Sequence, residues 1–206
     1  MNIFDAYLSH WNFLNVSRET VDQFSIFINL LKERQKRDNL ISRNSIDDIW
    51  IRHVIDSVQL LQFVSRETSS VTDFGTGGGF PGIILSIMQP QIAFKFVEVR
   101  QKKILFLKEV ISSLSLNAEV IGERIEHLRP WKEEVITARA LAPLNQLLPL
   151  LYPFTTRETT LILPKGKKVE EELKEIKKKW HADMEKKESY TNSEGMILIV
   201  KNLMPK

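Results

Sequence analysis

The chain has 206 residues, of which 43% are hydrophobic and 27% are charged, a composition typical of a soluble globular protein with one α/β-sized domain. It contains no cysteine, which excludes disulfides, cysteine–metal sites and cysteine nucleophiles, and its four histidines lack metal-ligand spacing. The net charge of +3 and the pI near 9.0 permit a nucleic-acid partner without demanding one. No signal segment and no apolar run of about 18 residues is visible, so we expect a cytoplasmic protein with neither a metal nor a membrane partner.

The N-terminal third of the sequence predicts a helical cap, because it contains neither glycine nor proline. Helices are expected over residues 3–15, 20–38 and about 46–64. Thr20 is the expected N-cap of the second helix, and Ser45 with Asp48 forms a variant capping box ahead of the third. The cap is expected to span residues 1–70.

From residue 71 onward, strand-like and helical segments alternate. Strands are expected at residues 71–74, 92–97, 118–121, 134–138, 159–163 and 196–201, with a weaker one near 183–189. Helices are expected at residues 82–89, 101–115, 143–151 and 168–181. This alternation predicts an α/β domain over residues 71–206, with a mostly parallel sheet covered by helices on both faces. The last two strands, which have no helix between them, predict an antiparallel edge.

The most informative stretch is the turn after the first strand. That strand ends at Asp73 and is followed by glycines at positions 75, 77, 78 and 79, and Pro81 stands where a helix should begin. Glycines at a strand-to-helix turn let the backbone approach a ligand closely, with free amides that point at it. The turn therefore predicts a cofactor of the nucleotide type.

Two interpretations of this turn compete. Residues 77–82 satisfy G-x-G-x-x-G, the dinucleotide fingerprint, which alone is a weak signal for an NAD-dependent oxidoreductase. Residues 73–79 also read Asp-x-Gly-x-Gly-x-Gly, the first motif of S-adenosylmethionine (SAM) methyltransferases. Asp73 favours SAM because a carboxylate would repel a pyrophosphate, and Pro81 lacks an N–H that a phosphate could use. A non-catalytic nucleotide- or RNA-binding module stays open as a third alternative.

Polar residues follow the next two strands at the edge where ligands bind in such sheets. Glu98 is placed to accept hydrogen bonds from ribose hydroxyls, in NAD and SAM folds alike. Ile125 and Glu126 are expected beside the adenine, although surface polarity would also explain them. The basic run Arg100–Lys103 opens a helix against its dipole, which hints at an anionic group nearby or simply at a solvated surface.

The end of the fourth strand indicates the kind of target. It carries Arg139-Ala140-Leu141 and lacks the Asp/Asn-Pro-Pro-aromatic motif of exocyclic-amine methyltransferases, while the missing cysteine excludes a covalent pyrimidine adduct. A ring nitrogen such as guanine N7 remains, and its methylation needs placement rather than a general base. Arg139 could hold the guanine or a phosphate, or form an ion pair at the sheet edge. In the turn after the fifth strand, Lys165, Lys167 and Lys168 are RNA-contact candidates.

These residues together resemble the ribosomal small-subunit methyltransferase G family, also called glucose-inhibited division protein B. The likeness runs through Asn39-Leu40-Ile41, Arg52-His53-Val54-Ile55-Asp56-Ser57, the loop 71–82, Lys102-Lys103 with Phe106-Leu107, Arg124-Ile125-Glu126, Arg139-Ala140 and Leu163-Pro164-Lys165-Gly166. It implies a Rossmann-like seven-stranded SAM-dependent methyltransferase fold with an N-terminal helical extension. The implied reaction is N7 methylation of a guanosine in 16S rRNA, with the ribosomal RNA or the small subunit as partner.

The resemblance also implies site residues. The cofactor site would be lined by Asp73, Gly75, Thr76, Gly77, Gly78, Phe80, Glu98, Ile125, Glu126 and Arg139. The RNA would be faced by Arg52, His53, Arg139 and Lys165, next to the lysines at 167 and 168.

Overall fold

The computed structural model describes residues 16–206, so the helix expected at residues 3–15 lies outside the described residues. Its centre is a seven-stranded sheet of order β3-β2-β1-β4-β5-β7-β6. The strands are β1 (Ser70–Phe74), β2 (Ala93–Val97), β3 (Ala118–Ile121), β4 (Val135–Thr137), β5 (Thr160–Lys165), β6 (Trp180–Glu188) and β7 (Met196–Pro205). Strands β1 to β5 pair in parallel, and β7 runs antiparallel to both β5 and β6. The predicted α/β fold and its antiparallel edge are confirmed.

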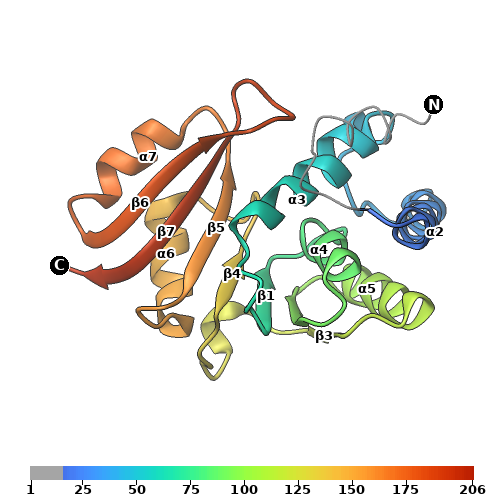
Figure 1. Cartoon of the computed structure of the whole chain (residues 1–206), viewed down its shortest axis with the longest axis horizontal. Helices are drawn as coiled ribbons and strands as arrows, with labels where there is room; N and C mark the ends of the chain where they lie inside the picture. The colour runs from blue at the N-terminus through green and yellow to red at the C-terminus, as the bar shows by residue number, and fades with distance from the viewer. Residues whose placement is uncertain (1–15) are drawn as a thin grey trace.

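Helices cover both faces of this sheet (Figure 1). They are α2 (Arg18–Gln35), α3 (Asp56–Val58), α4 (Gly82–Met88), α5 (Gln101–Leu114), α6 (Leu144–Leu151) and α7 (Val169–Ile176). Successive strand residues point to opposite faces, so Ile162 packs with α2, α4 and α5, while Leu161 and Leu163 pack with α6 and α7. None of the described helices is long and apolar enough to span a membrane.

The first described helix begins earlier than expected. Its N-cap is Ser17, whose hydroxyl accepts the N–H of Thr20 at 3.1 Å, so the prediction of Thr20 as the cap was wrong. The helix ends at Gln35 rather than at residue 38, because the side chain of Gln35 accepts the N–H groups of Leu40 and Ile41 at 2.9 and 3.0 Å and turns the chain.

The third predicted helix is not one regular helix. A 3-10 turn η1 (Arg43–Ser45) is followed by a π-helical turn η2 (Trp50–Ile55), by α3 and by a 3-10 turn η3 (Gln59–Phe63). The predicted capping box was wrong: the hydroxyl of Ser45 donates to the carbonyl of Ser42 and contacts His53 Nε2 at 2.8 Å. π-Helical turns are frequent at functional sites, which directs attention to η2.

At the other end of the chain, α7 is shorter than the lysine-rich pattern suggests. It ends at Ile176 and not at residue 181, because Trp180 already begins β6 and pairs with Pro205 of β7. Long-range strand pairing here overrides local helix propensity.

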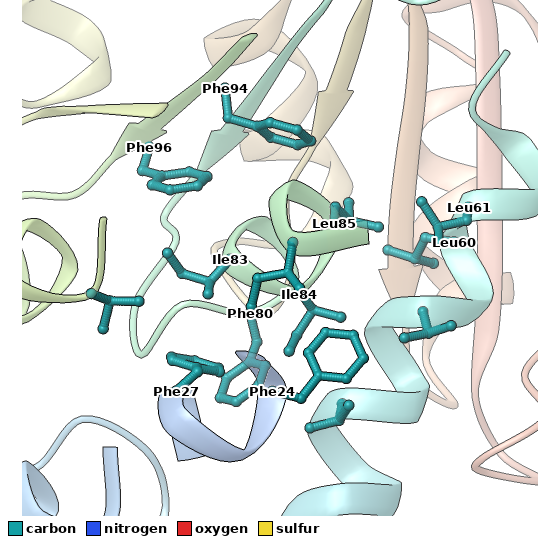
Figure 2. Close-up of a cluster of buried hydrophobic side chains, with 14 of the residues drawn as sticks. Phe24, Phe27, Leu60, Leu61, Phe80, Ile83, Ile84, Leu85, Phe94 and Phe96 are labelled. Atoms are coloured by element: carbon teal, nitrogen blue, oxygen red, sulfur yellow. The ribbon is translucent and has the colours of Figure 1, made fainter. Parts of the chain in front are cut away.

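The cap and the sheet share one hydrophobic core (Figure 2). Phe24 and Phe27 of α2 are fully buried, and the rings of Phe27 and Phe80 lie 5.2 Å apart, beside Ile83 of α4. Each such side chain stabilises the fold by about 1.5–3 kcal/mol through burial. The division into residues 1–70 and 71–206 stays a prediction, but this packing fixes the cap against the glycine loop.

Candidate functional site

A cavity of about 410 Å³ opens at the carboxyl ends of the parallel strands, where ligands bind in open α/β sheets. Its volume lies within the range of roughly 300–1,000 Å³ that small-molecule sites show. It is lined by Gly75, Gly77, Val97, Glu98, Val99, Arg100, Lys103, Glu123, Arg124, Ile125, Glu126, Ala140, Leu141, Ala142 and Leu150. The predicted residues Gly75, Gly77, Glu98, Ile125 and Glu126 therefore meet in one place.

The glycine loop between β1 and α4 forms one wall of this cavity. Gly75 and Gly77 have φ angles of +74° and +61°, which L side chains rarely adopt. A Cβ on Gly75 would lie 2.8 Å from Leu141, and a Cβ on Gly77 would lie 3.5 Å from the ammonium of Lys103. Backbone strain thus favours glycine at both positions, and at Gly75 a side chain would also have to displace Leu141.

The amides of Gly75, Thr76 and Gly77 are not free, which corrects the expectation that the loop amides point at the ligand. The N–H groups of Gly75 and Thr76 donate to the carbonyl of Val97 at 2.8 and 3.2 Å. The N–H of Gly77 donates to Glu98 Oε2 at 3.0 Å. The loop is therefore prebuilt by its own hydrogen bonds.

Asp73 lies beneath the loop and does not line the cavity. Its side chain is fully buried, and its two oxygens accept the hydroxyl of Thr137 at 2.7 Å and the N–H of Gly82 at 3.1 Å. Burial raises the pKa of the Asp73 carboxyl to about 6, against the opposing effect of these hydrogen bonds. Thr76 is buried as well, and its hydroxyl donates to the carbonyl of Asp73 at 2.8 Å. Both side chains hold the loop from behind.

Glu98 connects β2 to the loop and faces the cavity. Besides Gly77, its carboxylate accepts the N–H groups of Val99 and Arg100 at 2.8 and 2.9 Å. A carboxylate offers about four acceptor sites, so a site remains for a ligand hydroxyl.

Lys103 lines the same cavity, but the sequence placed it only in a basic run and not among the cofactor-binding residues. Its amine is half-buried, and this burial lowers its pKa, while the charge of Glu98 opposes the shift. Among residues 16–206 it forms no ion pair, so its charge is available to an anionic group. The signal was present in the basic run at the start of α5.

Two loop residues predicted to bind the cofactor face the cap instead. A Cβ on Gly78 would meet Ile41 at 2.7 Å, so Gly78 is packed against the connector that follows α2. Phe80 is 4% exposed. Its ring stacks on the ring of His53, with 4.7 Å between the ring centres, and it also lies beside the ring of Phe27 in α2.

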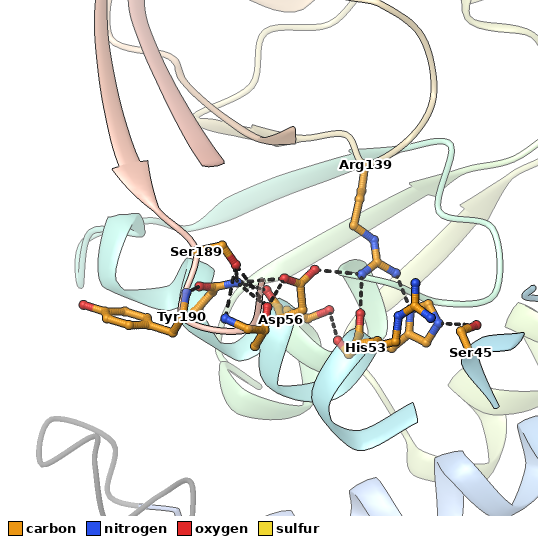
Figure 3. A network of polar contacts seen from close by, with 10 residues as sticks. Ser45, His53, Asp56, Arg139, Ser189 and Tyr190 are labelled. Atoms are coloured by element: carbon orange, nitrogen blue, oxygen red, sulfur yellow. Dashed lines mark hydrogen bonds and ion pairs between the residues drawn. The ribbon is translucent and has the colours of Figure 1, made fainter. Parts of the chain in front are cut away.

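Arg139 joins the end of β4 to the cap (Figure 3). Its Nη1 donates to Asp56 Oδ2 at 3.0 Å and to the carbonyl of Arg52 at 3.3 Å. Its Nη2 contacts His53 Nδ1 at 2.9 Å, and its guanidinium carbon lies 5.6 Å from the ring centre of Phe80. Arg139 lies next to the cavity through Ala140 but is not part of its wall, so the ion pair weighed as an alternative is what the structure contains.

His53 is neutral in this arrangement. Its burial, together with the charges of Arg139 and Arg52, lowers its pKa to about 3. Since Nδ1 accepts from Arg139, the proton is assigned to Nε2, which then donates to Ser45 at 2.8 Å. His53 is thus occupied by protein partners at both ring nitrogens.

The remaining predicted RNA contacts are divided between inward-facing and exposed residues. Lys165 is turned inward, since its ammonium pairs with Glu172 at 2.7 Å and donates to the carbonyl of Ala142 at 3.2 Å. Lys167, Lys168 and Arg52 are exposed. Residues 16–206 contain no cluster of His, Asp or Glu that could hold a metal ion.

The family model and the similar proteins found by comparison carry the same description. The model of a family described as rRNA small subunit methyltransferase G matches residues 20–200. The "Ribosomal RNA small subunit methyltransferase G" of Zymomonas mobilis is 36% identical over 94% of this chain and 90% of its own length. That of Erythrobacter litoralis is 39% identical over 87% of each chain.

A solved SAM-dependent methyltransferase from Aquifex aeolicus superimposes with a TM-score of 0.61, at 15% identity, over 84% of this chain and 98% of its own. At this level of identity the superposition supports the fold alone.

Proposed function

The chain belongs to the rRNA small subunit methyltransferase G family, and we propose that it transfers the methyl group of SAM to N7 of a guanosine in small-subunit ribosomal RNA. SAM is the cofactor and ribosomal RNA the substrate class.

The observation that carries the proposal is the buried carboxylate of Asp73 at the start of α4. In a dinucleotide site the pyrophosphate lies at the N-terminus of this helix and uses the loop amides. Here the first helical N–H is taken by Asp73, and the amides of Gly75, Thr76 and Gly77 are bonded within the protein. A negative charge at this position repels phosphates and favours a cationic sulfonium. The NAD-dependent alternative is therefore disfavoured by electrostatics.

The wall of the cavity suggests how SAM lies. The methionine end belongs beside Gly75 and Gly77, where the backbone is exposed by the lack of side chains. Glu98 has an acceptor site left for ribose hydroxyls, and Ile125 with Glu126 provides the surface for the adenine. The ammonium of Lys103, which forms no ion pair within the described residues 16–206, suits the carboxylate of the methionine moiety.

The methyl transfer needs no acid–base catalysis by the protein. SAM supplies a methyl group on a sulfonium, and transfer breaks its C–S bond, with the electron pair passing to sulfur. The lone pair of N7 forms the new bond without the loss of a proton, so no general base is required. Placement of N7 in line with the methyl group is then the main contribution of the protein, and such placement is worth up to about 7–11 kcal/mol.

Arg139 is proposed to hold the target nucleotide near the cavity. It must not donate to N7, because that hydrogen bond would occupy the attacking lone pair. An N–H of its guanidinium would instead bind O6 of the guanine or a phosphate oxygen.

The proposal is tested by methyl transfer from labelled SAM to small ribosomal subunits that lack the modification, with free small-subunit RNA as a parallel substrate. Digestion to nucleosides should place the label in 7-methylguanosine at one position. Label in another nucleoside would overturn the N7 assignment. No label on either substrate, from folded protein that binds SAM, would overturn the proposal and favour a non-catalytic module.

A further inference from the structure

We propose that Asp56 is a positioning residue for the transfer reaction. Asp56 holds the guanidinium of Arg139 in place and is itself held by the loop 189–195 between β6 and β7. This inference rests on the proposed function, because it concerns how that reaction holds its target. The contacts of Asp56 join three segments that are far apart in sequence: the π-helical turn of the cap, the end of β4 and the C-terminal hairpin.

Asp56 occupies the centre of this network, directly after η2 (Figure 3). Its Oδ2 accepts Arg139 Nη1 at 3.0 Å. Its Oδ1 accepts the hydroxyl of Thr191 at 2.6 Å and the side-chain amide of Gln59 at 2.8 Å. The side chains of Asp56 and Arg139 are each 18% exposed, so their ion pair is less screened by solvent than a surface pair.

The hairpin loop fixes Asp56 through two residues. Thr191 binds it directly, and Gln59 is fully engaged between Asp56 and the loop. The amide of Gln59 donates to Ser189 Oγ at 3.1 Å, while its carbonyl oxygen accepts the N–H of Tyr190 at 2.9 Å. In Figure 1 this hairpin extends from the sheet toward the cap. A shift of the loop would therefore be passed to the orientation of Asp56.

The bonds of Arg139 leave a defined part of its guanidinium available. Both N–H groups of Nη1 are used by Asp56 and Arg52, and one N–H of Nη2 is used by His53. The N–H of Nε and the second N–H of Nη2 have no partner among residues 16–206. Phe80 lies against the guanidinium at 5.6 Å. The group is thus held in one orientation, with neighbouring donors left for an oxygen of the target nucleotide.

Holding the guanidinium in advance lowers the entropy lost when the target binds. Stability alone does not call for such a network, since a partly buried ion pair is often no more stabilising than apolar residues of similar size. The cap is already joined to the sheet by the phenylalanine core of Figure 2. The polar network therefore serves to orient Arg139 beside the cavity.

The test compares Asp56→Asn with wild type in methyl transfer to small subunits, and measures kcat, KM for the subunit, and the Kd for SAM. The amide keeps the size of the side chain and removes its charge. We expect kcat/KM to fall by about 10- to 100-fold, the loss expected for one charge-assisted hydrogen bond, with the SAM Kd within about twofold of wild type. Asp47→Asn, an identical change at an exposed position of the same segment, should match wild type.

A double-mutant cycle separates positioning from general destabilisation. If Asp56 acts through Arg139, adding Asp56→Asn to Arg139→Ala should cost little further activity. Thr191→Val should cause a smaller loss in the same direction, and it decides the matter if Asp56→Asn does not fold. Multiplicative losses in the cycle, or a parallel rise of the SAM Kd, would overturn the role of Asp56.

Wild-type activity distinguishes the two proposals. If wild type transfers methyl groups and Asp56→Asn does so equally well, the positioning role alone is overturned. If wild type transfers none, the proposed function fails, and this inference fails with it.

Discussion

The carboxylate of Asp73 and the N–H of Gly82 lie 3.1 Å apart, so a buried negative charge occupies the N-terminus of α4. The same position holds a phosphate in dinucleotide sites. The contact that ties the glycine loop to its helix thus also holds a buried negative charge beneath that loop.

This charge predicts a pH dependence of cofactor binding. Because burial raises the pKa of Asp73 to about 6, the carboxyl is ionised at pH 8 and protonated at pH 5. The affinity for cationic SAM should fall as the pH drops through about 6, by about tenfold. Asp73→Asn should bind SAM about tenfold more weakly at pH 8 and lose the pH dependence. Isothermal titration calorimetry of wild type and Asp73→Asn at both pH values measures the Kd for SAM.

The stability of the variant provides the control. The folded pKa of Asp73 is raised above its ordinary value of 3.8, so its carboxyl contributes stability that is present at low pH and is lost as the pH rises through about 6. Asp73→Asn should therefore be at least as stable as wild type at pH 8 in urea unfolding. A variant that unfolds more easily there, or that keeps the pH dependence of binding, would refute this account.

Much of the fold is predictable because its signals are local. The alternation of strands and helices after residue 71 places every strand of the sheet to within a few residues, since each apolar run and each turn carries its own signal. The glycines at positions 75 and 77 likewise predict a loop whose backbone conformation other residues would not readily adopt.

What the sequence does not reveal depends on distant contacts. The π-helical turn η2 forms where His53 reaches Ser45 and Arg139, and no local pattern contains Arg139. Arg139 was expected to face a ligand, yet its charge is paired with Asp56. Lys103 was not assigned to the cofactor site because a basic helix start has the same sequence pattern whether it lines a cavity or faces solvent.

A second prediction concerns the glycine loop itself. Gly77→Asp introduces a side chain at a φ of +61°, with its Cβ 3.5 Å from the ammonium of Lys103, and places a negative charge in the cavity. We expect SAM binding to be lost, with a Kd raised by about 100-fold or more. Gly166→Asp is the matched control, because a Cβ there meets nothing within 4 Å. Equal SAM affinity in folded Gly77→Asp would place the cofactor elsewhere.

A third prediction concerns the core that supports the loop. Phe27 is fully buried against Phe80, and its ring reaches the place where a Cβ on Gly79 would stand. Phe27→Ala should lower the free energy of unfolding by about 3–5 kcal/mol in urea titrations. Ile26→Ala, on the adjacent position of α2 and 46% exposed, should cost much less. Similar losses in both variants would contradict the packing shown in Figure 2.

The last prediction concerns the group of the cofactor that the charged ammonium of Lys103 binds. If its ammonium binds the carboxylate of the methionine moiety, Lys103→Met should raise the Kd for SAM by about tenfold, because the stem is kept and the charge is lost. Decarboxylated SAM lacks the partner group, so wild type and Lys103→Met should bind it with equal affinity. Lys108→Met, further along α5 and exposed, controls for the change in net charge. A loss of affinity for both ligands would show that Lys103 shapes the cavity rather than pairing with the carboxylate, whereas no loss for either would place its ammonium outside the cofactor's reach.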